Sequence, residues 1–221
     1  MHEKVLRELS VAAIGAFILL NSDFSAAIDY PYEMGVEAKV DFANGEPAND
    51  MAGMGIVGHF ALADQWWLSA SIDLLEYDFE EPVKIIEMEQ DALQASKAID
   101  STVTANNFGI RLERRYGTGR MGSNWFWDAG LGLGVLSVAD VSGPAAGGGR
   151  FNLTSDVGTE VLILGGLGYR HAFGERWILA QRIGVTQHRT NWEVRDSVSG
   201  RSGQVDNYTT IGLSVGVDYR F

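Results

Sequence analysis

The side chains in this chain that can do chemistry are its serines, histidines and carboxylates, because it has no cysteine for thiolate chemistry or disulfides. Nucleophilic catalysis by serine needs a histidine and an acid within hydrogen-bond reach. His59 and His171 each precede two apolar residues, and His188 falls on the polar face of an alternating run. The spacing of these residues along the chain indicates no Ser-His-acid set, although residues on different strands could still come together to form one. We therefore expect no enzyme activity.

The glycine-rich segment from Gly130 to Gly134 invites comparison with a phosphate-binding loop. Such a loop must open a helix, whereas no helical pattern follows here and the three glycines share one parity. The segment therefore predicts a strand with one face of small residues. We expect no cofactor and no metal ion.

Charged residues recur at every second position of several runs, opposite apolar residues. Eight acids and six bases share the polar parity, so that their charges nearly balance. They are the candidate lumen-lining residues: Glu33, Glu37, Lys39, Asp41, Asp73, Arg111, Glu113, Arg115, Asp128, Glu160, Arg170, Arg182, Asp218 and Arg220.

Alternation with period two is the signature of a strand whose two faces meet different surroundings. Eight runs show it, and they predict an antiparallel meander. The runs are Tyr32–Phe42, Ala52–Leu62, Trp66–Leu74, Thr104–Tyr116, Asn124–Ala139, Ser155–Ala172, a run from Arg176 to about 190, and Tyr208–Phe221.

The connections between these runs alternate in length. Short ones follow the second, fourth and sixth runs, at 63–65, 117–123 and 173–175. Long ones lie at 44–51, 80–103, 140–154 and about 191–206. Transmembrane barrels have this asymmetry, with tight periplasmic turns and long extracellular loops.

Alternation alone would also fit a soluble lipocalin-like barrel with an apolar interior. Aromatic residues decide between the two, because they gather on the apolar parity near the short connections, as at a membrane interface. We therefore predict an all-β, eight-stranded antiparallel up-and-down transmembrane β-barrel, with the last strand paired to the first because hydrocarbon tolerates no open edge. The candidate membrane girdle is Trp66, Tyr116, Trp125, Trp127, Tyr169, Trp177, Tyr219 and Phe221.

Residues 1–27 are similar to a secretory signal peptide. Lys4 and Arg7 precede the apolar run from Val11 to Leu20, and small residues follow at 25–27. A short amphipathic or buried helix is the alternative. The barrel domain would then cover 28–221. A net charge of −12 argues against a nucleic-acid partner.

The closing segment VGVDYRF resembles the C-terminal signature of the eight-stranded outer-membrane barrels of Gram-negative bacteria, and the resemblance covers about Ile28 to Phe221. It implies export to the outer membrane, insertion by the barrel-assembly machinery through the last strand, and contact with outer-membrane lipids and lipopolysaccharide. The segments ALADQWWLSASIDLL and SVGVDYRF look similar to the OmpW family, whose members are narrow channels for small, often apolar, molecules. OmpA-like and OmpX-like barrels share most of these features.

Two functions remain open at this stage. The first is a narrow channel for small or apolar solutes, since glycines at 130, 132, 134, 212 and 216 leave part of the inner wall thin. The second is a non-conducting structural or interaction barrel, with a lumen plugged by ion pairs and with extracellular loops on display. A helical stripe over 83–99 predicts a helix at the barrel mouth, either a solvated cap, a gate for a hydrophobic ligand, or a contact to lipopolysaccharide through divalent cations.

Overall fold

The computed structural model describes residues 32–43, 50–63, 65–79, 101–117, 123–138, 141–144, 150–155, 157–198, 200 and 202–221. The signal peptide predicted over 1–27 and the helix predicted over 83–99 lie outside these residues. Residues Tyr32–Phe221 form one compact unit. Within the described part of the chain, no helix has the length and apolar character needed to cross a membrane.

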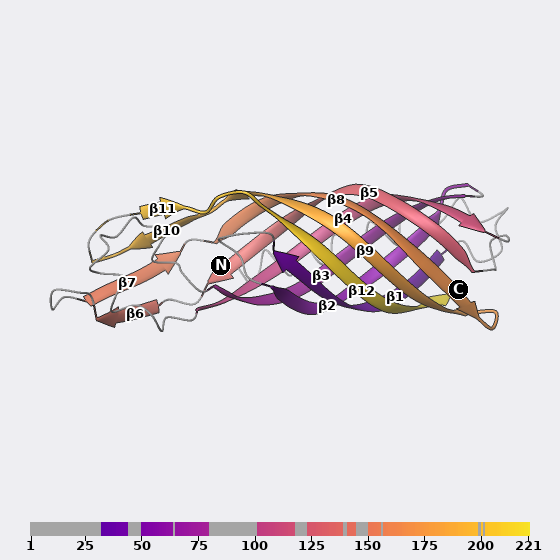
Figure 1. The fold of residues 1–221 in the computed structure, drawn as a ribbon, viewed down its shortest axis with the longest axis horizontal. Helices are drawn as coiled ribbons and strands as arrows, with labels where there is room; N and C mark the ends of the chain where they lie inside the picture. Colours follow the sequence, from indigo (N-terminus) through magenta and orange to yellow (C-terminus); the bar gives the residue numbers. More distant parts are fainter. Residues whose placement is uncertain are drawn as a thin grey trace. The chain divides into compact units, whose positions relative to one another are not determined.

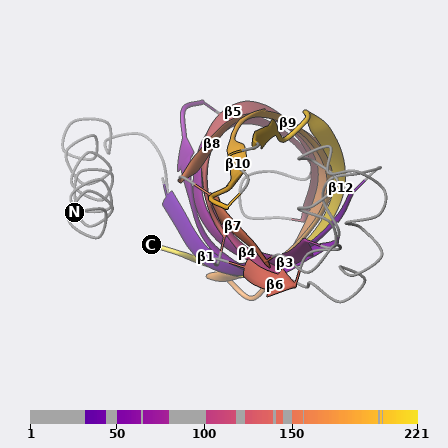
Figure 2. The same ribbon diagram turned by 90° about the vertical axis from the view of Figure 1, so that its left-hand side faces the viewer.

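Eight antiparallel strands close into a barrel, as Figures 1 and 2 show. Each strand pairs with the barrel strand before it in the chain, which confirms the predicted eight-stranded meander. The strands are β1 (Tyr32–Ala43), β2 (Met51–Ala61), β3 (Trp66–Phe79), β4 (Ser101–Gly117), β5 (Asn124–Val138), β8 (Gly158–Phe173), β9 (Trp177–Asn191) and β12 (Tyr208–Arg220).

The ring is closed by pairing of β1 with β12. The register runs from Glu33 opposite Arg220 to Ala43 opposite Thr210. One further backbone bond, from Phe221 N to Tyr32 O at 3.2 Å, extends the contact past the last strand residue. The barrel therefore has no free edge whose amides would lack partners.

Burial alternates along the strands, and it is the charged side chains that are buried and the apolar ones that are exposed, the reverse of a soluble barrel. Met54 and Leu131 on the outer wall are 72% and 63% exposed, whereas Glu33 on the inner parity is 1% exposed. Large apolar side chains thus cover the outside while charged side chains fill the inside. This is the distribution that a strand needs when its outer face meets hydrocarbon.

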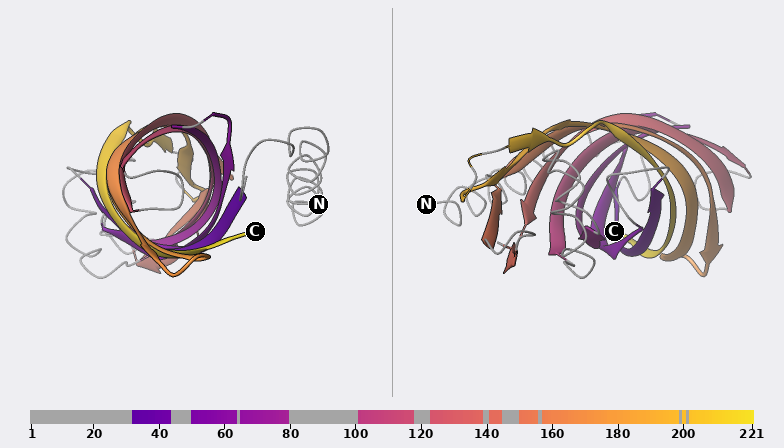
Figure 3. Two further views of the ribbon diagram at one scale, coloured as in Figure 1. Left: turned by 90° about the vertical axis from the view of Figure 1, so that its right-hand side faces the viewer. Right: turned by 60° about the vertical axis from the view of Figure 1, so that its left-hand side comes forward.

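The two ends of the barrel differ. The short connections after β2, β4 and β8 lie at one end, together with Tyr32 and Phe221, and we call this the turn end. The left panel of Figure 3 views the barrel from this side. In the connection between β8 and β9, Gly174 has a φ of 77°, a conformation that favours glycine. The opposite end, from which the longer connections start, is the loop end.

Two of the connections predicted as long loops contain strands. β6 (Val141–Pro144), β7 (Arg150–Ser155), β10 (Glu193–Asp196) and β11 (Ser202–Gln204) form a second sheet in the order β11-β10-β7-β6. The central pair joins segments about 40 residues apart, since Val194 lies opposite Ser155. Asp196 Oδ1 holds the sheet by accepting from Asn152 N at 3.0 Å. The barrel therefore carries an ordered four-stranded sheet at its loop end (Figure 1).

Candidate functional site

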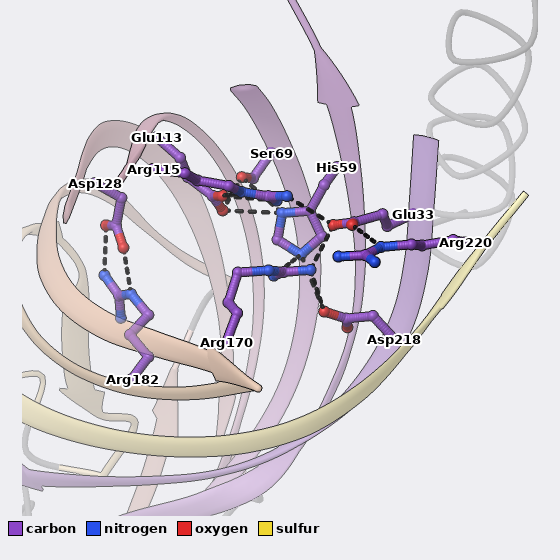
Figure 4. A network of polar contacts seen from close by, with 10 residues as sticks. All are labelled: Glu33, His59, Ser69, Glu113, Arg115, Asp128, Arg170, Arg182, Asp218 and Arg220. Atoms are coloured by element: carbon purple, nitrogen blue, oxygen red, sulfur yellow. Dashed lines mark hydrogen bonds and ion pairs between the residues drawn. The ribbon is translucent and has the colours of Figure 1, made fainter. Parts of the chain in front are cut away.

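A buried cluster of charged side chains crosses the barrel interior near the turn end. We call it the turn-end cluster, and Figure 4 shows it. Its members come from six barrel strands and include both acids and bases. They are Glu33 of β1, His59 of β2, Ser69 of β3, Glu113 and Arg115 of β4, Arg170 of β8, and Asp218 and Arg220 of β12.

Glu33 is the centre of this cluster. Its Oε2 accepts from Arg115 Nη1 at 2.9 Å, and its Oε1 accepts from Arg220 Nε at 2.9 Å. Arg170 Nη2 also donates to Oε2. A carboxylate with 1% exposure must gain such charge-assisted bonds to offset the cost of leaving water.

Arg170 reaches Glu33 from the far side of the ring, because β9 and β12 stand between β8 and β1 in the sheet. The same guanidinium lies at ion-pair distance from Asp218, with Nη2 2.7 Å from Oδ2. Its Nη1 lies 3.3 Å from His59 Nε2. One side chain therefore bridges the lumen and contacts β1, β2 and β12 together.

Glu113 forms the second half of the cluster. Its Oε2 accepts two hydrogen bonds from one guanidinium, from Arg115 Nε at 3.1 Å and from Nη2 at 3.0 Å. Its Oε1 lies 2.9 Å from His59 Nδ1 and accepts from the Ser69 hydroxyl. The Arg115 guanidinium also lies 3.7 Å from the ring centroid of Trp67, so that an aromatic face covers the cation.

The structure thus brings together a serine, a histidine and an acid that the sequence left apart. Ser69 Oγ and Glu113 Oε1 both approach the same imidazole nitrogen of His59, Nδ1. In a catalytic relay the acid and the nucleophile contact opposite ring nitrogens. All three side chains are also at most 5% exposed. The three side chains therefore have the contacts of a structural polar network and lack the arrangement of a catalytic relay.

A second ion pair lies in the lumen outside the turn-end cluster. Arg182 of β9 donates from Nε and Nη2 to the two oxygens of Asp128 on β5, at 2.7 and 2.8 Å. Because β8 separates these strands, the guanidinium passes over Gly166, where a Cβ would lie 2.6 Å from Nη2. The small residue makes room for the pair.

The other small residues of the inner wall act in the same way. A Cβ at Gly212 would lie 2.0 Å from Asp41 Oδ1, and one at Gly134 would lie 2.4 Å from Glu160 Cγ. At Gly130 it would meet the backbone of β4, 2.1 Å from Ile110 O. These glycines therefore accommodate charged side chains and close strand packing.

Polar pairs continue toward the loop end. Lys39 Nζ donates to Asp73 Oδ2 at 3.0 Å. His188 Nδ1 lies 3.0 Å from Glu160 Oε2, and its ring stacks on Tyr208 with centroids 4.2 Å apart. Between these pairs lies a cavity of about 10 Å³ with Lys39 and Asp73 in its wall. This is about the space that one water molecule requires.

At the loop end the interior becomes apolar. Five inward side chains there are at most 2% exposed: Met51, Leu75, Val103, Leu136 and Trp192. Leu75 and Leu136 stand on either side of Ala105 in register across three strands. This apolar layer was not predicted from the sequence, although most of its residues lie on the inward parity of their strands. The lumen thus changes from charged to apolar along its length.

The candidate lumen-lining residues all lie on the inward parity of their strands. Glu37 and Arg182 are half-buried and the others are buried. Seven of them keep a buried side-chain atom that has no hydrogen-bond partner: Glu37, Asp41, Asp73, Arg111, Glu160, Arg170 and Asp218. The other seven candidates are Glu33, Lys39, Glu113, Arg115, Asp128, Arg182 and Arg220.

The candidate girdle residues lie on the outer wall around the turn end and contact one another. The closest ring pairs are Trp125–Tyr169 at 4.8 Å and Trp177–Tyr219 at 5.0 Å between centroids. Tyr219 also contacts Phe221, and Trp66 contacts Trp127. Tyr116 is bonded to Trp127. The rings thus form a belt around the turn end.

Metal binding finds no support in the described part of the chain, which holds no group of three or more histidine, cysteine or acidic side chains placed to bind an ion. The exposed pair of Ser123 and His171, 3.2 Å apart, lies at the turn end. Its serine Oγ also accepts from Ala172 N at 3.2 Å, so the contact fixes the end of β8.

No family model matches the sequence. No curated protein matches it either. Among solved structures, the outer membrane protein OprG of Pseudomonas aeruginosa is similar, with 11% identity, a TM-score of 0.55, and coverage of 86% of this chain and 95% of OprG.

Two further structures share the architecture at lower TM-scores. Neisserial surface protein A has 17% identity and a TM-score of 0.49 over 86% of this chain and 97% of its own. Ail of Yersinia pestis has 12% identity and a TM-score of 0.45 over 86% and 96%. The closed topology and the likeness to OprG together show the fold of an eight-stranded outer-membrane β-barrel, as predicted.

Proposed function

We propose that this protein is a non-conducting barrel of the outer membrane of a Gram-negative bacterium, which holds its second sheet and loops at the cell surface. The turn end would face the periplasm and the loop end the lipopolysaccharide leaflet, as in other barrels with this asymmetry. Residues 1–27 would direct export, and β12 would be the strand that the barrel-assembly machinery engages.

The observation that carries the proposal is the turn-end cluster. Three carboxylates and three guanidiniums join across the lumen, with Arg170 as the bridge between opposite walls. The apolar layer at the loop end adds a second obstruction. Because an eight-stranded barrel is only wide enough for side chains to fill, two such layers favour a plugged lumen.

A narrow channel for small or apolar solutes is the second candidate. The apolar layer is the observation that favours it, since apolar solutes enter such surroundings more readily than ions do. The charged cluster below that layer opposes it, because solute passage would need several buried ion pairs to part.

Planar-bilayer recording on the purified protein separates the two candidates. A plugged barrel gives no steady conductance steps, and liposomes that contain it exclude small polar dyes as well as protein-free liposomes do. Steady steps, or polar-dye uptake above that of protein-free liposomes, would refute the plug and favour the channel.

Membrane location is tested separately. Unboiled protein from the outer-membrane fraction is expected to migrate faster on an SDS gel than boiled protein, since a closed barrel resists the detergent. Recovery of the protein in the soluble periplasmic fraction would refute the proposed location.

A further inference from the structure

Arg114 is a cation on the outer wall of the barrel, the wall that would face lipid. Arg114 of β4 shares the outward parity with Leu112 and Tyr116, which are both 40% exposed. Its neighbours Glu113 and Arg115 point inward, into the turn-end cluster. From the turn end to mid-barrel, Arg114 is the one charged residue on the described outward positions of β3, β4 and β5.

Aromatic side chains surround this guanidinium. In register, Arg114 lies between Trp66 of β3 and Trp127 of β5. Its Cζ is 5.3 Å from the Trp66 ring centroid and 5.1 Å from that of Tyr116. Ring faces attract a cation and exclude water from it, so the position of the guanidinium is fixed. We call these four side chains the Arg114 cage.

The cage is itself held together. Trp66 and Trp127 meet edge to face, with centroids 5.8 Å apart. Trp127 Nε1 donates to the Tyr116 hydroxyl oxygen at 3.0 Å. Because that oxygen accepts, the hydroxyl proton of Tyr116 is available to donate outward. The cage therefore presents a fixed cation and a hydroxyl donor side by side.

The hydrogen-bonding demand of Arg114 is not met within the described residues. Its Nε is shielded from solvent and has no hydrogen-bond partner. The ion pairs between described residues do not include it. A guanidinium carries five N–H donors and cannot lose its proton. In surroundings poor in water, such a group requires an anion.

The aromatic belt sets the depth at which that anion must lie. Tryptophan and tyrosine belts sit at the level of lipid headgroups. The anion available at that level is the phosphate of a glycerophospholipid, whose oxygens match the fork of a guanidinium. The apolar wall beyond the cage, with Ile110 46% and Leu131 63% exposed, would take the acyl chains.

We infer that the Arg114 cage is a binding site for the phosphodiester headgroup of a glycerophospholipid in the leaflet at the turn end. Arg114 binds the phosphate through its fork, and Tyr116 donates a further hydrogen bond. This inference rests on the proposed membrane location, and it assigns to one place on the wall a lipid contact that would otherwise be spread evenly around the barrel.

Native mass spectrometry of the detergent-solubilised protein tests the site. We would add phosphatidylglycerol, or diacylglycerol with the same chains but no phosphate. The unmodified protein is expected to retain one phosphatidylglycerol at least fivefold more often than one diacylglycerol. Equal retention of the two lipids would overturn the inference. Glycerol phosphate without chains serves as a third probe, and binding as strong as that of the lipid would assign the site to a free phosphate ester.

Substitutions locate the binding. Arg114→Gln is expected to lower retention of phosphatidylglycerol about fivefold or more, and Arg114→Lys, which keeps the charge but loses the fork, to an intermediate value. Arg189→Gln removes an outward cation of β9 at the loop end and should change retention less than twofold. Unchanged retention in Arg114→Gln would refute the site. Faster gel migration of each unboiled variant shows an intact barrel, so that loss of lipid binding is distinguished from failure of the proposed barrel.

Discussion

Arg170 and Glu33 form an ion pair across the inside of the barrel, although two strands separate β8 from β1 in the sheet. Both side chains are at most 2% exposed. Neighbouring strands are already joined by backbone hydrogen bonds, whereas this pair joins walls that have no backbone contact. The turn-end cluster therefore joins β8 to β1 directly, which the backbone hydrogen bonds of the sheet cannot do.

Replacement of Arg170 by Met should be strongly destabilising. It leaves Glu33 and Asp218 buried with fewer counter-charges, and the loss of one partner of a buried pair costs about 3–5 kcal/mol. Urea unfolding of the protein in detergent micelles, followed by tryptophan fluorescence, measures the change.

The control is Arg195→Met in the second sheet. Arg195 and Glu193 are 3.7 Å apart, with side chains 64% and 54% exposed, so their pair is weak. A loss of stability in Arg170→Met no larger than in this control would mean that the turn-end cluster does not stabilise the barrel.

Asp128 and Arg182 should show thermodynamic coupling. Asp128→Asn alone leaves the guanidinium without its bidentate partner, and Arg182→Met alone leaves a buried carboxylate. The double variant leaves neither an unpaired guanidinium nor an unpaired carboxylate in the lumen. A double-mutant cycle by urea unfolding is expected to give a coupling of about 1–3 kcal/mol. If the losses of unfolding free energy in the two single variants simply add up in the double variant, Asp128 and Arg182 do not interact as described.

Gly130→Ala should disturb the barrel more than Gly165→Ala. A Cβ at Gly130 would lie 2.1 Å from the backbone oxygen of Ile110, whereas the nearest atom to one at Gly165 is 3.9 Å away. Overpacking against backbone costs about 1–3 kcal/mol. Unfolding midpoints in urea report the difference, and equal midpoints for the two variants would show that β4 and β5 are not packed as described.

Leu131→Arg tests which wall faces lipid. Leu131 is 63% exposed at the middle of β5, where an arginine in hydrocarbon costs about 2–4 kcal/mol. Val198 is 62% exposed in the turn after β10, away from the barrel strands. Val198→Arg should have almost no effect. Refolding into lipid vesicles with a urea titration compares them, and equal stabilities would place Leu131 outside the hydrocarbon.

The strand faces were predictable because parity needs no tertiary information. Trp66 and Trp67 are adjacent in the chain, yet Trp66 joins the belt while Trp67 is 3% exposed beneath Arg115. Alternation of side chains along a strand explains both positions. The number of barrel strands followed from the same pattern, whereas the closing pair followed from the need of a membrane barrel to leave no backbone edge unpaired.

Contacts across the lumen were not predictable in this way. Parity shows that Glu33 and Arg170 both point inward, but their relative depth depends on the stagger of every strand between them. The sheet formed by β6, β7, β10 and β11 was also missed, because its strands are three to six residues long and its central pair, β7 with β10, joins distant segments. Such short strands carry too little alternation to be distinguished from a loop.

The closing register of β1 and β12 has a consequence for assembly. A slip of two residues would keep every apolar side chain facing outward, so the membrane alone does not forbid it. It would, however, move Glu33 from Arg220 to a position opposite Asp218, and like charges directly opposite each other repel. The buried charges therefore favour the observed register, because it places Glu33 opposite Arg220 and not opposite Asp218.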